Sequence, residues 1–82
     1  MSVAVAREGI EYGNELVHEI LRMRQENGKP MSQYRIAQVL GLTDQAVYKW
    51  VKGQSSPLRQ NYDKLLEYER YLKLINQRRP AW

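Results

Sequence analysis

Two short amphipathic segments, with one glycine among the three residues between them, place the strongest constraint on how this chain can fold. Apolar residues recur at helical spacing in residues 33–40 and again in residues 44–52, and Gly41 lies between them. Ser32 and Thr43 are suited to cap the starts of these helices. Gly41 is suited to end the first one, because glycine takes the left-handed conformation without a Cβ penalty. The pattern predicts two short helices joined by a tight turn.

The segments on either side of this unit also have helical signals. Periodicity predicts a helix of about residues 14–27, with Asn14 as its N-cap. A long helix is predicted from about 57 to 77, with Ser56 as its N-cap and Pro57 as its first residue. The sequence therefore predicts an all-α fold, a compact four-to-five-helix domain that contains a helix-turn-helix and has a long C-terminal helix.

We expect this domain to occupy residues 13–78, preceded by an arm at 1–12 that is flexible or a short strand and followed by a tail at 79–82. With 82 residues and no cysteine, the chain is expected to build one small core without disulfides. Its longest purely apolar run, residues 3–6, is too short for a membrane span or a signal peptide. We therefore expect a soluble, cytoplasmic protein.

Positive charge is concentrated in the middle and C-terminal parts of the chain. The net charge of +4 divides into −1 for residues 1–32 (four basic, five acidic), +3 for residues 33–60 (four basic, one acidic) and +2 for residues 61–82 (five basic, three acidic). The excess begins where the helix-turn-helix begins. Clustered basic charge is typical of proteins that bind a polyanion.

The central segment, about residues 32–57, resembles the DNA-binding domain of the phage repressor and Cro-like family (lambda-repressor-like domains). The resemblance rests on small Ala37 where the two helices cross, on Gly41 in the turn, and on five apolar inner positions: Ile36, Leu40, Leu42, Val47 and Trp50. It implies that the second helix lies in the DNA major groove. By resemblance, the base-reading positions of the family correspond to Thr43, Asp44, Gln45, Tyr48 and Lys49.

The residues on the outward side of the second helix have side chains suited to base edges. Gln45 can form paired hydrogen bonds with adenine, and Lys49 can donate to guanine O6 and N7. Tyr48 can stack on a thymine methyl group or donate to a phosphate. Asp44 has two possible roles, because its carboxylate can accept from cytosine N4 or stabilise the N-terminus of its own helix.

Phosphate contacts are expected from polar and basic side chains near the helix ends, which fix the register on DNA without reading sequence. The candidates are Gln33, Arg35, Lys52, Gln54, Ser55 and Ser56. Each of them is alternatively a solvated surface residue, and Ser56 is alternatively only an N-cap.

The long last helix has an apolar stripe wider than a single small core requires. We expect part of it to form a homodimer interface through Leu65, Tyr68, Leu72 and Ile75. A dimer would place two recognition helices about one DNA turn apart. Pairing through the N-terminal arm is the alternative.

The sequence thus predicts a sequence-specific double-stranded-DNA-binding transcriptional regulator, a small phage or mobile-element repressor or Cro-like protein that binds an operator as a homodimer. An excisionase-like or antitoxin-like DNA binder would have the same features, and a helical protein-interaction module that does not bind DNA is the alternative from another class. The chain has one histidine, no cysteine and no phosphate-cradling glycine-rich loop. We therefore expect no enzyme, no metal site, no cofactor, no small-molecule ligand and no membrane partner.

Overall fold

The computed structural model describes residues 13–77, which form an all-helical domain. A first helix over residues 13–21 is followed by α2 (Gln33–Leu40), α3 (Asp44–Lys52) and α4 (Arg59–Gln77). The predicted fold class is confirmed, because the described part of the chain is all-α and contains a helix-turn-helix and a long last helix.

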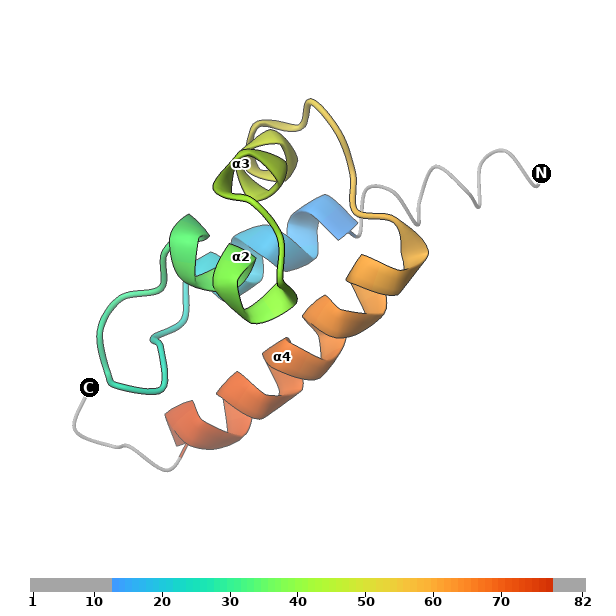
Figure 1. Cartoon of the computed structure of the whole chain (residues 1–82). Helices are drawn as coiled ribbons and strands as arrows, with labels where there is room; N and C mark the ends of the chain where they lie inside the picture. The colour runs from blue at the N-terminus through green and yellow to red at the C-terminus, as the bar shows by residue number, and fades with distance from the viewer. Residues whose placement is uncertain (1–12, 78–82) are drawn as a thin grey trace.

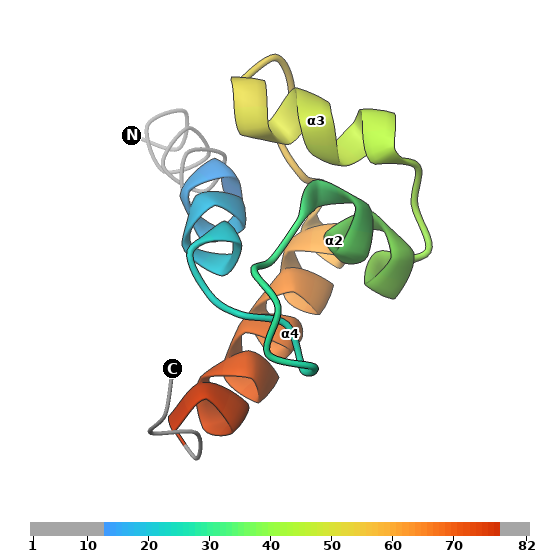
Figure 2. The same cartoon turned by 90° about the vertical axis from the view of Figure 1, so that its left-hand side faces the viewer.

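The first helix and α2 lie on the same side of α4, and α3 lies beyond α2 at one end of the molecule (Figures 1 and 2). The bounds of α2 and α3 agree with those that the sequence predicts. The arm expected at residues 1–12 and the tail expected at 79–82 lie outside the described residues.

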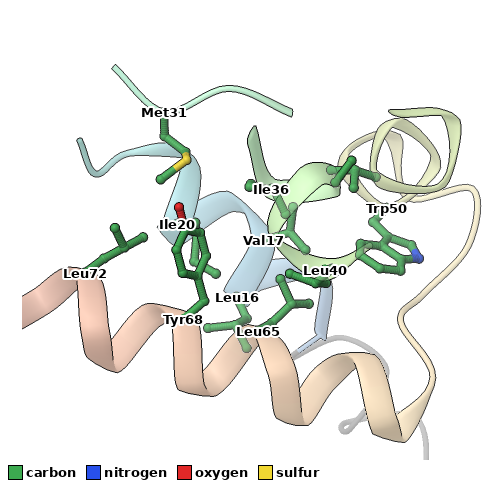
Figure 3. Packing of buried hydrophobic residues seen from close by; sticks show 12 residues of the cluster. Leu16, Val17, Ile20, Met31, Ile36, Leu40, Trp50, Leu65, Tyr68 and Leu72 are labelled. Atoms are coloured by element: carbon green, nitrogen blue, oxygen red, sulfur yellow. The ribbon is translucent and has the colours of Figure 1, made fainter. Parts of the chain in front are cut away.

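One hydrophobic core joins the four helices. Figure 3 shows side chains of the first helix, α2 and α3 directed toward the residues of α4. Burial of apolar surface is the main favourable contribution to folding, so this cluster fixes the arrangement of the helices. The buried members are Leu16, Val17, Ile20, Met31, Ile36, Ala37, Leu40, Val47, Trp50, Leu65, Tyr68 and Leu72.

Three of the four residues predicted at a dimer interface belong to this core. Leu65 and Leu72 are fully buried and Tyr68 is 6% exposed, whereas Ile75 is half-buried. The interface prediction was therefore wrong for Leu65, Tyr68 and Leu72. The apolar stripe of α4 is wide because both the first helix and α2 pack against it (Figures 1 and 3).

Local capping sets the limits of α2 and α3. Ser32 caps α2 and Thr43 caps α3, and each side chain accepts a hydrogen bond from the backbone N–H three residues later. Gly41 ends α2 with φ 73°, and Gly53 ends α3 with φ 74°. A Cβ at either glycine would have nothing within 4 Å, so the left-handed backbone and not crowding requires glycine there.

The first helix is shorter than the sequence predicts. Periodicity predicted a helix over about residues 14–27, but it ends at residue 21, and the next two N–H groups bond to carbonyls three residues back. The chain then turns, and Arg24 pairs with Pro30 in an isolated β-bridge. Asn76 of α4 hydrogen-bonds both the N–H and the carbonyl of Arg24. These tertiary contacts override the local helix propensity.

Two residues predicted as N-caps have other roles. Asn14 lies within the first helix, and its side chain donates to Trp50 O near the end of α3 and to Ser55 O in the segment that connects α3 with α4. Ser56 lies three residues before α4, which begins at Arg59 and not at 57. Its hydroxyl donates to Asn14 Oδ1 at 2.7 Å. The two side chains therefore bond each other across the fold, and neither caps the N-terminus of a helix.

Candidate nucleic-acid interface

The outward side of α3 is formed by polar and charged side chains. In both views α3 lies at one end of the molecule (Figures 1 and 2). Val47 and Trp50 are buried on its inner side, which fixes the rotation of the helix about its axis. The exposed residues of α3 are all candidates for DNA contact from the sequence: Asp44, Gln45, Tyr48, Lys49 and Lys52.

Gln45 and Lys49 lie one helical turn apart with unengaged side chains. Within residues 13–77, neither side chain makes a hydrogen bond or an ion pair. A glutamine amide offers two donors and an acceptor, and a lysine ammonium offers three donors. These groups are therefore free to bind a ligand without first breaking a bond inside the protein.

Tyr48 and Lys52 contact each other on the same side of α3. The Lys52 ammonium lies 5.6 Å from the centroid of the Tyr48 ring, within the range of a cation–π interaction. Tyr48 is 40% exposed. The pair joins a positive charge to an aromatic surface, and both suit a nucleic acid.

Thr43 and Asp44 are the two polar residues at the start of α3. Thr43 Oγ1 accepts from Ala46 N–H at 3.3 Å, which leaves the hydroxyl hydrogen to donate elsewhere. Asp44 is exposed in the first turn, where its charge meets the positive end of the helix dipole. Thr43 supplies the cap, and Asp44 is left exposed, so both of its expected roles, base contact and stabilisation of the helix start, stay predictions.

The other expected phosphate contacts differ in how accessible they are. Gln33 is half-buried as the first residue of α2, and Gln54 and Ser55 are exposed in the turn that follows α3. Ser56 is half-buried, and its hydroxyl hydrogen is engaged by Asn14 Oδ1. Ser56 is therefore not free to donate to a phosphate in this arrangement.

Arg35 is held by an ion pair inside the protein. Its Nη2 donates to Glu26 Oε2 at 3.0 Å, and its Nη1 donates to Gln38 Oε1 at 2.9 Å. The hydroxyl of Tyr68 donates to the other oxygen of Glu26 at 3.2 Å. A phosphate would have to compete with Glu26 for this guanidinium, so Arg35 joins the 22–32 loop to α2 and is a poorer phosphate candidate than Lys52.

The same network shifts the pKa of each of its ionisable groups. Burial alone would raise the pKa of Glu26, but a hydrogen bond from its own backbone and the contact with Arg35 outweigh it and lower that pKa. The hydrogen bond that Arg35 donates to Glu26 raises the pKa of Arg35. Burial, followed by the charge of Glu26, raises the pKa of Tyr68 to about 12. At neutral pH the ion pair is therefore fully charged and Tyr68 is a hydrogen-bond donor.

Sequence reasoning missed two residues that hold the end of α3. Asn14 Nδ2 donates to Trp50 O at 2.7 Å, and His18 Nε2 donates to Val51 O at 3.1 Å. These partners lie 36 and 33 residues away along the chain, so no local pattern points to them. In the sequence, Asn14 resembled a helix cap.

Within residues 13–77, none of the helices combines the length and the apolar character that a membrane span requires. The same residues contain no group of three or more potential metal ligands. The whole chain matches no protein-family model, no curated protein and no solved structure. What the protein does is therefore inferred from its own residues and geometry.

Proposed function

We propose that this protein is a sequence-specific double-stranded-DNA-binding regulator of transcription that inserts α3 into the major groove. The observation that carries the proposal is the outward side of α3, where Gln45, Tyr48 and Lys49 are exposed on a helix whose inner side is packed in the core. The major groove of B-DNA is about 12 Å wide and admits one α-helix. A short helix at one end of the molecule meets that requirement (Figure 2).

The residues around this helix divide into two kinds of DNA contact. Gln45 and Lys49 have free hydrogen-bonding groups suited to adenine and guanine, respectively. Lys52, Gln54 and Ser55 are exposed at the end of α3 and in the next turn, where donors to phosphate would fix the register of the protein. Base reading and positioning would thus come from adjacent parts of one surface.

We propose more specifically that the protein is a small phage or mobile-element repressor or Cro-like protein that occludes a promoter. An excisionase-like or antitoxin-like protein would read DNA with the same side of α3. The DNA context distinguishes these roles, because a repressor site overlaps a promoter and an excisionase site lies beside a recombination site.

We propose a homodimer as the active form, with an interface on the exposed side of α4. Exposed residues recur there at alternating three- and four-residue spacing: Lys64, Glu67, Tyr71 and Leu74. We call these four residues the α4 outer stripe. A depression of about 340 Å³ between α2 and α4 adjoins the stripe and includes Val39, which is 41% exposed.

Charge favours a second copy of the chain as the partner of this stripe. Lys64 and Glu67 have opposite charges and lie about one helical turn apart. In a two-fold contact residue i meets residue j and residue j meets residue i, so Lys64 of each protomer can pair with Glu67 of the other. The apolar groups of Tyr71 and Leu74 would be covered in the same contact.

The function is tested by selection from a randomised duplex pool with purified protein at about 0.15 M salt, followed by sequencing of the retained DNA. The proposal predicts enrichment of an inverted repeat whose half-sites are about 10 base pairs apart, centre to centre. An enriched single half-site would support DNA reading by a monomer and contradict the dimer. No enrichment at all would contradict the DNA-binding function and favour a protein-interaction module.

A further inference from the structure

The first helix holds the C-terminal end of α3 through side-chain hydrogen bonds. Asn14 uses both of its amide hydrogens in this contact, since Nδ2 donates to Trp50 O at 2.7 Å and to Ser55 O at 3.0 Å. Its Oδ1 accepts from the hydroxyl of Ser56 at 2.7 Å. One turn further along the helix, His18 Nε2 donates to Val51 O at 3.1 Å.

Two of these bonds are made to backbone carbonyls at the C-terminal end of α3. The last four carbonyls of a helix have no intrahelical N–H partner. Trp50 O and Val51 O are two of these four. Trp50 O accepts from the N–H of Gly53, the residue that ends α3, at 3.2 Å. Asn14 supplies a second donor to Trp50 O, and His18 supplies a donor to Val51 O. The following turn is fixed in the same way, because Ser55 and its neighbour Ser56 both bond to Asn14. A single side chain therefore ties the end of α3, the turn and the first helix together.

We propose that Asn14 is a positioning residue for DNA binding: it fixes the tilt of α3 and the path of the turn after it without touching DNA itself. This proposal rests on the DNA-binding function proposed above. Binding groups must be held within about 0.5 Å of their productive positions to act together. Without Asn14, the end of α3 and the turn after it would lose three hydrogen bonds to the first helix. The exposed side chains of Lys52, Gln54 and Ser55 would then be held less precisely relative to the rest of the fold.

The chain contains a matched control in Asn76. Its Nδ2 donates to Leu72 O at 2.7 Å and to Arg24 O at 3.4 Å, and its Oδ1 accepts from Arg24 N–H at 3.3 Å. Like Asn14, Asn76 donates two hydrogen bonds to backbone carbonyls and accepts one, but it connects α4 to the 22–32 loop, away from α3 (Figure 1). A variant at this position loses comparable bonds and leaves the end of α3 unchanged.

The test compares Asn14→Ala, Asn14→Asp and Asn76→Ala in the full chain, at a temperature where thermal melts show all of them folded. Affinity is measured for a duplex selected by the wild-type protein and for a scrambled duplex of the same length. We expect Asn14→Ala to weaken binding to the selected duplex by about tenfold, the factor that corresponds to about 1.4 kcal/mol. We expect it to reduce the ratio between the two duplexes as well.

Asn14→Asp should behave like Asn14→Ala, because a carboxylate has no N–H to give to Trp50 O and Ser55 O. Asn76→Ala should bind both duplexes as the wild type does. Amide hydrogen exchange adds a readout without DNA: in Asn14→Ala, exchange should accelerate at Gly53 and Gln54, whose N–H groups bond to carbonyls near the end of α3.

The possible outcomes separate this proposal from the function on which it rests. Equal losses in Asn14→Ala and Asn76→Ala would show a general stability effect and overturn the positioning role alone. Wild-type affinity in both Asn14 variants would overturn it too. If the wild-type protein selects no duplex, the DNA-binding function fails first and the positioning role fails with it.

Discussion

At the scale of single residues, Glu69 is a buried carboxyl that works against stability at neutral pH. It is 7% exposed, and Lys73 Nζ lies 3.7 Å from its Oε1. Burial, followed by a hydrogen bond with Glu19, raises the pKa of Glu69 against the attraction of Lys73. A raised pKa means that the fold binds this proton more tightly than the unfolded chain does. The contribution to stability is therefore fully present below the ordinary pKa of 4.5 and is lost as the pH rises through the folded value.

Glu69→Gln should accordingly raise the melting temperature at pH 7, because the amide is neutral and can still donate to Glu19. The difference from the wild type should disappear as the pH falls below about 4.5, where Glu69 is protonated. Thermal melts followed by circular dichroism across this range measure it. Asp63→Asn is the control, since Asp63 is exposed and pairs only with exposed Arg59 at 3.6 Å, a contact of little energetic weight. A lower melting temperature for Glu69→Gln at pH 7 would show that the Lys73 contact dominates.

The role proposed for Lys52, a phosphate contact, differs from the base reading proposed for Gln45 and Lys49. As a phosphate contact, Lys52→Ala should weaken binding to all duplexes about equally and lower the slope of log affinity against log salt by about one. Lys29→Ala removes the same charge from an exposed position in the 22–32 loop, away from α3, and should leave the slope unchanged. Titrations at several salt concentrations give both slopes. Loss confined to one DNA sequence would contradict the phosphate role.

At the scale of elements, the turn between α2 and α3 depends on the conformation of Gly41. A residue with a Cβ in the left-handed region costs about 1–2 kcal/mol. Because nothing crowds this position, Gly41→Ala should destabilise the fold by about that amount through backbone strain alone. Gly41→Asn should cost less, since asparagine tolerates this conformation. Urea unfolding measures both; equal effects would point to a cause other than the backbone.

The elements that sequence could predict are those whose limits are set locally. Ser32, Gly41 and Thr43 fixed the bounds of α2 and α3, and these bounds were confirmed. The first helix ends early because Asn76 bonds the backbone of Arg24 from 52 residues away. Such a contact is invisible to periodicity, which reports only neighbours along the chain.

The candidate site also has some features that local sequence predicts and others that depend on long-range contacts. The polar outer side of α3 could be predicted, because helical periodicity separates Gln45, Tyr48 and Lys49 from buried Val47 and Trp50. That Arg35 pairs with Glu26, and Ser56 with Asn14, could not be predicted, since both bonds depend on how the first helix and its loop pack. In each of these two pairs, a bond within the protein engages a side chain that was expected to contact phosphate.

At the scale of the whole molecule, the width of the apolar stripe on α4 was a misleading signal for dimerisation. The width of an apolar stripe indicates how much of the helix surface is buried in contacts, but it does not show whether the same chain or another chain makes those contacts. The structure assigns Leu72 to the core and leaves Leu74, 58% exposed, on the α4 outer stripe. These two leucines are two residues apart and distinguish a core position from a candidate interface.

Leu74→Glu should therefore remain folded and sediment as a monomer at concentrations where the wild type is dimeric, because a charge would be buried at the interface without a partner. Leu72→Glu should lose the fold, since burial of an unpaired charge costs several kcal/mol and the chain has only one small core. Sedimentation and circular dichroism separate the two effects. A Leu74→Glu protein that still sediments as a dimer would place the interface elsewhere.

The proposed reading of bases by the outer side of α3 is best tested at Lys49. The affinities of wild type and Lys49→Ala are measured against the selected duplex and against every single-base variant of one half-site, at one fixed salt concentration. We predict a loss of about 1–3 kcal/mol on the selected duplex, with discrimination relaxed at one base pair and retained at the others. Equal weakening on all duplexes, with discrimination retained at every base pair, would contradict base reading by α3.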